Sequence, residues 1–197
     1  MKKGKDLTNI KAILLGDVGV GKTNLINITC GQDFNRNEKS TVANSFMTRK
    51  INYNGKDYTI ELWDTAGQEK YYHITKIFFK GSNIVIFVFD VTNKSTFEGL
   101  KKWIDMTNQI LDGDFVCGLV GNKNDLFLNS QISEEECKNF ADSKKYKFKL
   151  VSALKSPKVF NEFFDELCLD YIKSHQNYQK RSISLLDVNE EHKKCPC

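Results

Sequence analysis

Short apolar runs alternate along the chain with longer segments in which apolar residues recur at helical spacing. The runs over residues 12–15, 84–89 and 115–120 are short and almost continuously apolar, and residues 146–151 form a further strand pattern. Continuous apolar runs are typical of strands that are buried on both faces of a parallel sheet. Because helical segments separate the strands, the sequence predicts an α/β fold with helices on both faces of the sheet.

One hairpin interrupts this parallel pattern. Residues 45–52 and 56–63 read as two strands, and the Asn54-Gly55 pair between them is typical of a tight hairpin turn. The residues before the hairpin, 31–42, are polar and lack an apolar period, so they are predicted to form a long loop. The sheet is therefore expected to be mixed and six-stranded, with one antiparallel strand.

Two helix starts are predicted from capping boxes, in which a serine precedes a glutamate by three residues. Ser95 with Glu98 predicts a helix over residues 95–111, and Ser133 with Glu136 predicts another.

A further helix is expected over residues 24–30 and a last, amphipathic one over residues 159–174. After about residue 177 the helical pattern fades, so residues 1–176 are predicted to form one domain and 177–197 a flexible tail. The core face of the last helix is predicted to consist of Phe160, Phe163, Phe164, Leu167 and Ile172.

The composition fits one globular domain and excludes several classes. With 197 residues, of which 40% are hydrophobic, the chain can bury one well-packed core. The net charge of +4 is small and dispersed, which argues against nucleic acid as a partner. No apolar run is long enough to span a bilayer, and no signal peptide is recognisable.

Four of the six cysteines are far apart within regular-looking segments, which favours free thiols in a reducing compartment over a disulfide framework. These are Cys30, Cys117, Cys137 and Cys168.

A phosphate-binding loop follows the first predicted strand. Gly16-x-x-x-x-Gly21-Lys22-Thr23 has the spacing at which backbone N–H groups and a helix N-terminus form an anion site. Lys22 is expected to reach the β- and γ-phosphates, and the Thr23 hydroxyl is expected to ligate Mg²⁺. The alternative is an ordinary strand-turn-helix corner. The predicted nucleotide contacts along this loop are Gly16, Asp17, Val18, Gly19, Val20, Gly21, Lys22, Thr23 and Asn24.

A second motif, Asp64-Thr-Ala-Gly67-Gln68, ends the second strand of the hairpin. Asp64 lies where a carboxylate can hold Mg²⁺, and Gly67 can offer a backbone N–H to a γ-phosphate. The Gln68 amide can both accept and donate hydrogen bonds, so it suits the orientation of an attacking water and is the candidate catalytic residue.

A third motif, Asn122-Lys123-x-Asp125, follows a buried strand. The Asp125 carboxylate can accept hydrogen bonds from N1 and the 2-amino group of guanine, whereas adenine would leave this charge unpaired. The stem of Lys123 can pack on the base, and Asn122 can tie its loop to the phosphate loop. A polar turn is the alternative.

In this order, the three motifs, Thr41 and Ser152-Ala153 resemble the Ras superfamily of small GTPases, over residues 10–175. The resemblance implies a P-loop NTPase fold with five helices. It also implies that Phe34 flanks the guanine and that Thr41 completes the Mg²⁺ shell. The Ala153 N–H would face guanine O6 beside Ser152, and Leu154 would give an apolar contact to the base in place of the usual lysine.

Other segments resemble the Rab branch of this superfamily. Trp63 before Asp64 and Phe78-Phe-Lys-Gly match Rab patterns, and Phe46, Trp63 and Phe78 match the aromatic triad that Rab proteins present to effectors. Phe46 could instead fill the core.

The end of the chain, Cys195-Pro-Cys197, is similar to Rab termini that carry two geranylgeranyl groups. Two lipid chains suffice for stable anchoring where one does not. The alternative is a metal site formed by His192 and the two cysteines.

Two departures bear on activity and partners. Val18 occupies the phosphate-loop position where Ras proteins have glycine, and its branched side chain is expected to slow hydrolysis. Residues 42–46 depart from the usual Rab pattern, which makes this a divergent member.

The resemblance implies a monomer that cycles between GDP and GTP on the cytosolic face of a membrane. Its implied partners are an exchange factor, a GTPase-activating protein, a GDP-dissociation inhibitor and trafficking effectors. One rival is a GTP-binding interaction module with negligible turnover. A nucleotide kinase is rejected, because it would need an arginine-rich lid and the chain has only Arg36, Arg49 and Arg181.

Overall fold

The computed structural model describes residues 8–38, 41, 45–65, 78–112 and 114–191. A six-stranded sheet with the strand order β2-β3-β1-β4-β5-β6 forms its centre. All neighbouring strands pair in parallel except β2 and β3, which are antiparallel. The mixed, mostly parallel sheet predicted from the sequence is confirmed. Its strands are β1 (Asn9–Leu15), β2 (Ser45–Tyr53), β3 (Lys56–Asp64), β4 (Ile84–Asp90), β5 (Val116–Asn122) and β6 (Lys147–Leu150).

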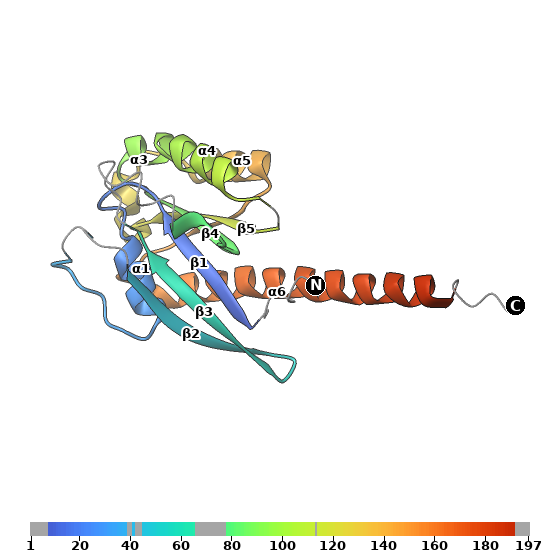
Figure 1. Cartoon of the computed structure of the whole chain (residues 1–197). Helices are drawn as coiled ribbons and strands as arrows, with labels where there is room; N and C mark the ends of the chain where they lie inside the picture. The colour runs from blue at the N-terminus through green and yellow to red at the C-terminus, as the bar shows by residue number, and fades with distance from the viewer. Residues whose placement is uncertain (1–7, 39–40, 42–44, 66–77, 113, 192–197) are drawn as a thin grey trace, which may run out of the picture.

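Helices cover both faces of this sheet. Helices α1 and α6 lie on one face, and α3, α4 and α5 lie on the other (Figure 1). The described part of the chain contains five α-helices, the predicted number, and one 3₁₀ helix. They are α1 (Lys22–Thr29), α3 (Lys94–Glu98), α4 (Leu100–Ile110), α5 (Glu134–Lys144), α6 (Pro157–Glu191) and the 3₁₀ helix η2 (Asn124–Asn129).

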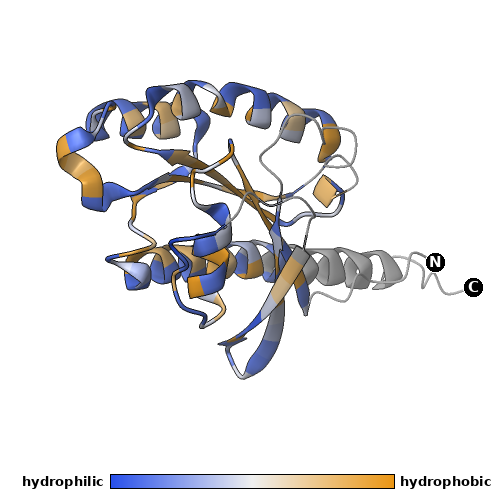
Figure 2. Cartoon of the chain, turned by 90° about the vertical axis from the view of Figure 1, so that its left-hand side faces the viewer, coloured by the Kyte–Doolittle hydropathy of each residue, from blue (hydrophilic) through white to orange (hydrophobic). Residues whose placement is uncertain are grey.

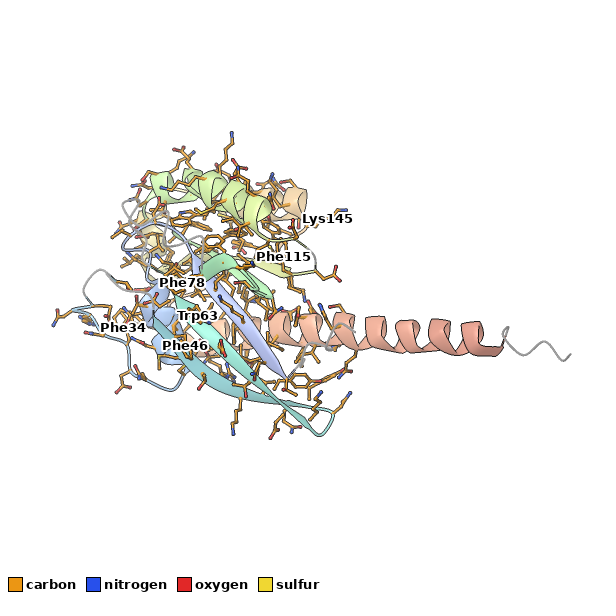
Figure 3. All side chains as sticks on the ribbon, in the orientation of Figure 1. Phe34, Phe46, Trp63, Phe78, Phe115 and Lys145 are labelled. Atoms are coloured by element: carbon orange, nitrogen blue, oxygen red, sulfur yellow. The ribbon has the colours of Figure 1, made fainter. Side chains whose placement is uncertain are left out.

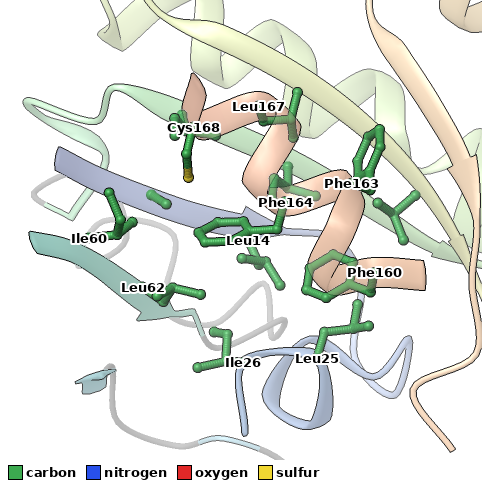
Figure 4. Packing of buried hydrophobic residues seen from close by; sticks show 14 of the residues in the cluster. Leu14, Leu25, Ile26, Ile60, Leu62, Phe160, Phe163, Phe164, Leu167 and Cys168 are labelled. Carbon is green, nitrogen blue, oxygen red and sulfur yellow. The ribbon is translucent and has the colours of Figure 1, made fainter. Parts of the chain in front are cut away.

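Strands β1, β4 and β5 contribute side chains to two core clusters, one on each face of the sheet. In β4, consecutive residues such as Ile86 and Phe87 point to opposite faces of the sheet, as the two-residue period of a strand requires. The hydropathy colouring shows apolar strands between helices whose outer faces are polar (Figure 2). On the α1–α6 side, Phe160, Phe164 and Leu167 of α6 pack against strand residues such as Leu14 (Figure 4).

The hairpin prediction is confirmed. Strands β2 and β3 are joined at Asn54 and Gly55, which have φ angles of 52° and 75°. Two consecutive positive φ angles are characteristic of a type I′ turn, which asparagine and glycine tolerate best.

Of the two predicted helix starts, one is confirmed and one is wrong. The Ser133 side chain accepts a hydrogen bond from the Glu136 N–H at 3.1 Å and caps α5. At the other site the cap is Asn93, whose Oδ1 accepts from the Ser95 N–H at 3.1 Å. Asparagine at this position competes successfully because its side-chain oxygen reaches the first-turn N–H two residues ahead. The predicted helix over residues 95–111 is also divided, since α3 ends before Gly99 and α4 begins after it.

Helix α6 is longer than predicted, because its backbone remains helical through Glu191 instead of ending near Ser174. The segment after Ser174 contains no glycine or proline before Pro196, so no residue type breaks the helix. The regular spacing of apolar residues is lost where α6 extends beyond the sheet (Figure 1). Within the described ranges, no helix is both long and apolar enough to cross a membrane.

Candidate functional site

A cavity of about 350 Å³ opens where β1, β3, β5 and β6 end. The carboxyl ends of parallel strands meet at one edge of a sheet, so loops far apart in sequence converge there. Many of the predicted site residues line this single cavity: Val18, Gly19, Gly21, Lys22, Thr23, Asn24, Phe34, Thr41, Asn122, Lys123, Asp125, Ala153 and Leu154.

The backbone of the phosphate loop depends on glycine where it approaches its neighbours. Gly21 has φ of 95°, and a Cβ atom there would lie 2.4 Å from Asn122 Nδ2. Gly16 has φ of 154°, and its Cβ would lie 2.1 Å from the Val88 carbonyl oxygen. A side chain at either position would displace the loop from the end of the sheet.

Lys22 is held by the loop that it follows. Its Nζ donates to the carbonyl oxygens of Gly16 at 2.8 Å and Asp17 at 2.9 Å. Burial lowers the pKa of Lys22 from 10.5 to about 8, with the carboxylates of Asp64 and Asp17 opposing this shift. A buried cation with only partial compensation by carboxylates is a favourable site for a phosphate.

Three oxygen-bearing side chains meet at one end of the cavity. The Thr23 and Thr41 hydroxyls donate to Asp64 Oδ2 at 2.8 and 3.1 Å, and the two hydroxyl oxygens are 2.9 Å apart. Burial raises the pKa of Asp64, although both hydrogen bonds and the Lys22 charge act in the opposite direction. The other carboxylate oxygen, Oδ1, is buried without a hydrogen-bond partner.

This oxygen cluster fits a hard divalent cation such as Mg²⁺. Hydroxyl and carboxylate oxygens are the ligands such cations prefer, and a cation would compensate the unpartnered Asp64 Oδ1. No group of three or more His, Cys, Asp or Glu side chains in the described part of the chain is placed to hold a metal. That Thr23, Thr41 and Asp64 hold Mg²⁺ stays a prediction, with which this oxygen cluster is compatible.

Asn122 connects three loops at the other end of the cavity. Its Nδ2 donates to the Val20 carbonyl oxygen at 2.9 Å, which is the expected tie to the phosphate loop. Its Oδ1 accepts from the Ala153 N–H at 3.2 Å. The Ala153 N–H, predicted to face a base oxygen, thus has a protein partner that a base would have to share or replace.

Asp125 is oriented by Ser152, which reaches it from behind. The Ser152 hydroxyl donates to Asp125 Oδ1 at 2.6 Å and accepts from the Lys155 N–H at 2.9 Å. Ser152 is buried and does not line the cavity, so its contribution is to hold the carboxylate that does.

Lys123 has an ionic partner, Asp90, that was not predicted from the sequence. Lys123 has a positive φ of 64°, and its Nζ lies 2.6 Å from Oδ2 of the buried Asp90. Asp90 is fixed in turn by Thr92, whose N–H and hydroxyl donate to its Oδ1. Asp90 ends a strand as Asp64 does, and this shared position is the signal that could have found it.

Asp17 contacts the site through its backbone only. Its Oδ1 accepts from Trp103 Nε1 of α4 at 2.9 Å, directed away from the cavity. The close approach depends on Gly99, where a Cβ would lie 2.6 Å from Asp17 Oδ2. Gly16 and the buried Val20 also stay behind the cavity lining, whereas Val18 lies on it with 44% of its surface exposed.

Five residues of the cavity lining were not predicted: three lie in a polar loop that gives no periodic signal, one follows Asp64 and one lies in η2. They are Asn35, Arg36, Glu38, Thr65 and Leu126. Four predicted residues, Gly67, Gln68, Cys195 and Cys197, lie outside the residues that the structure describes, and so does His192.

The predicted aromatic triad forms a surface cluster beside β2 and β3 (Figure 3). Phe46 stacks on Trp63 with ring centroids 4.9 Å apart, and Phe78 lies 5.5 Å from Trp63. Because Phe46 is 51% exposed, the alternative that it fills the core is wrong. The Lys11 ammonium lies 4.4 Å from the Trp63 ring centroid, which adds a positive charge to this apolar surface.

Comparison with known proteins agrees with this geometry. The Ras family profile matches residues 11–173. The chain is 38% identical to Ras-related protein RIC2 of Oryza sativa subsp. japonica over 82% of the chain and 74% of that protein. It is 36% identical to Ras-related protein RABA1g of Arabidopsis thaliana, over 94% and 82% respectively. It is also 38% identical to Ras-related protein Rab11E of Lotus japonicus, over 82% and 74%.

Proposed function

The chain belongs to the Ras family of small GTP-binding proteins, and we propose that it is a Rab-type switch that hydrolyses GTP to GDP and phosphate. Members of this family are generally GTP hydrolases.

One observation carries the proposal: the cavity has a phosphate and metal end and a base end formed by different loops. Lys22, Thr23 and Asp64 lie at the first end, whereas Asn122 and Asp125 lie at the second. Asp125 selects guanine, because an acidic side chain facing the acceptor edge of adenine would be left unpaired.

At the phosphate end, the residues of this chain bind the phosphates and Mg²⁺ and orient the attacking water. Lys22 pairs with the terminal phosphates, and Thr23, Thr41 and Asp64 hold Mg²⁺, which when bound neutralises charge on the phosphate oxygens. Gln68 orients the attacking water, and the Gly67 N–H contacts the γ-phosphate. Both residues follow Asp64 closely in sequence, which supports their assignment to this end of the site.

We propose that hydrolysis is slow without a partner. Val18 lines the cavity with an exposed, branched side chain, and such a group restricts the space for Gln68 and for an inserted arginine. The alternative function is a GTP-binding interaction module with negligible turnover.

We propose that the remaining features serve membrane trafficking. Similarity to Rab proteins supports the proposal that effectors bind the surface formed by Phe46, Trp63 and Phe78. It also supports an exchange factor, a GTPase-activating protein and a GDP-dissociation inhibitor as regulators. Geranylgeranyl groups on Cys195 and Cys197 would anchor the chain, acting as a monomer, to a cytosolic membrane face. Intact mass of the protein from eukaryotic cells tests this: two added lipid masses are expected, and none in a Cys195→Ser/Cys197→Ser variant.

Single-turnover phosphate release tests the catalytic proposal. Purified protein is loaded with GTP and Mg²⁺, and released phosphate is followed beside a Gln68→Leu variant, which cannot orient water. Slow release that is clearly faster than that of the variant supports the switch. Stable GTP in both proteins would refute hydrolysis and favour the binding module.

A further inference from the structure

The side chain of Asn24 binds the chain's own backbone across the edge of the cavity. Asn24 Nδ2 donates to the Asn35 carbonyl oxygen at 3.0 Å, and Asn24 Oδ1 accepts from the Asn35 N–H at 2.8 Å. Asn24 lies in the third position of α1 with 8% of its surface exposed. One amide side chain therefore satisfies both backbone groups of one residue in the following loop.

This pair holds one wall of the cavity. Phe34, Asn35, Arg36 and Glu38 line the cavity from the loop after α1, and Figure 3 shows Phe34 beside that helix. The Asn35 side chain bonds only within the loop, to Glu38 and to the Asn37 N–H. Residues 31–38 are exposed to solvent except Phe34, which is partly buried and packs against the core.

The N–H of Gln32 donates to the Asn27 carbonyl at the start of the loop. Among the described residues between Gln32 and Thr41, the two bonds with Asn24 are the hydrogen bonds that join the loop to the rest of the chain. Their loss would leave this segment held by the packing of Phe34 against the core, and Phe34 belongs to the wall at the base end. Opening this wall gives a bound nucleotide its route to solvent.

We propose that Asn24 is a positioning residue that fixes this wall by its paired hydrogen bonds and thereby sets the rate at which guanine nucleotide leaves. The inference rests on the proposed function, because it presumes a nucleotide in the cavity. That Asn24 also contacts the nucleotide stays a prediction, since Asn24 lines the cavity while its side chain bonds to Asn35.

The test is the release of a fluorescent N-methylanthraniloyl-GDP from the full-length protein and from Asn24→Ala. Alanine preserves the helix and removes both bonds. Each bond is worth about twofold to tenfold, and water replaces part of it at the exposed Asn35, so release is expected to be about tenfold faster. The association rate is not expected to fall, because a wall that opens more readily does not obstruct entry of the nucleotide.

Two controls separate this effect from general damage. Asn37→Ala removes the same amide group from an exposed position of the loop outside the cavity lining, and release is expected to stay within about twofold. EDTA is expected to accelerate release by the same factor in wild type and Asn24→Ala, because Thr23, Thr41 and Asp64 are unchanged.

The outcomes are distinct. Equal release from wild type and Asn24→Ala would overturn the positioning role while leaving nucleotide binding intact. A variant that loses affinity through slower association, with a lower melting temperature, would show that Asn24 only supports α1, and would overturn it too. Failure of wild type to bind the GDP analogue would instead refute the proposed function.

Discussion

Replacing Asn122 with alanine should destabilise the protein strongly, because one buried amide joins three loops. The substitution leaves the Val20 carbonyl and the Ala153 N–H without their partners, in residues that are 0% and 4% exposed. Each orphaned group costs about 1–3 kcal/mol, so the expected loss of unfolding free energy is about 2–6 kcal/mol. That is a large part of the about 5–15 kcal/mol that stabilises a typical domain.

Urea unfolding of the nucleotide-free protein measures this loss, because bound GDP would add a stabilisation that depends on the affinity of each variant. With a slope of about 2 kcal/mol per molar urea, the midpoint should fall by about 1–3 M. The matched control is Asn129→Ala, which removes the same amide from an exposed position at the end of η2 and should change stability by at most about 0.5 kcal/mol.

Gly21→Ala provides an independent check of the same geometry. The new Cβ would lie 2.4 Å from Asn122 Nδ2, so the alanine should destabilise partly by displacing that amide. In the Gly21→Ala/Asn122→Ala double variant this clash is absent, and the combined loss should fall short of the sum by about 0.5–3 kcal/mol. A wild-type midpoint for Asn122→Ala, or strictly additive losses, would refute the argument.

Three further predictions concern the surrounding structure. Trp103→Phe keeps a buried aromatic ring but loses the hydrogen bond to Asp17 of the phosphate loop, so the rate of GDP release should rise severalfold. A wild-type release rate would show that this hydrogen bond does not help to hold the phosphate loop. Val18→Ser should hydrolyse bound GTP faster in single turnover, and an unchanged rate would remove Val18 as the cause of slow turnover. Burial raises the pKa of Cys117 and of Cys137 to about 12 from 9.0, so both should resist iodoacetamide at pH 8 until urea unfolds the chain. Their contribution to stability is complete below pH 9 and is lost as the pH rises towards 12, because only the unfolded thiols then ionise; a Cys117→Ala variant should show a shallower loss above pH 9.

Much of the fold could be predicted because its signals are local. The apolar run of β4 must be buried whichever neighbours it has, and Asn54-Gly55 adopts its two positive φ angles within the turn itself. The helix boundaries were less certain, since Asn93 and Ser95 both suit an N-cap and the choice depends on how the chain leaves β4.

The sequence by itself predicted the mixed sheet, the phosphate loop and most of the residues that line the cavity. The phosphate loop and the Asn122-Lys123-x-Asp125 motif follow from short spacings, in which residue type and backbone conformation constrain each other directly, whereas Phe34, Thr41 and Ala153 were implied by the family resemblance. Only the tertiary structure decided which side chains pair across the site: Asn24 with the Asn35 backbone, Lys123 with Asp90, and Asp17 with Trp103. Such pairs join separate segments, and each polar group had several chemically suitable partners in the sequence. The choice was made by packing, because only the partner that lies within hydrogen-bond distance in the folded chain can compensate the loss of water.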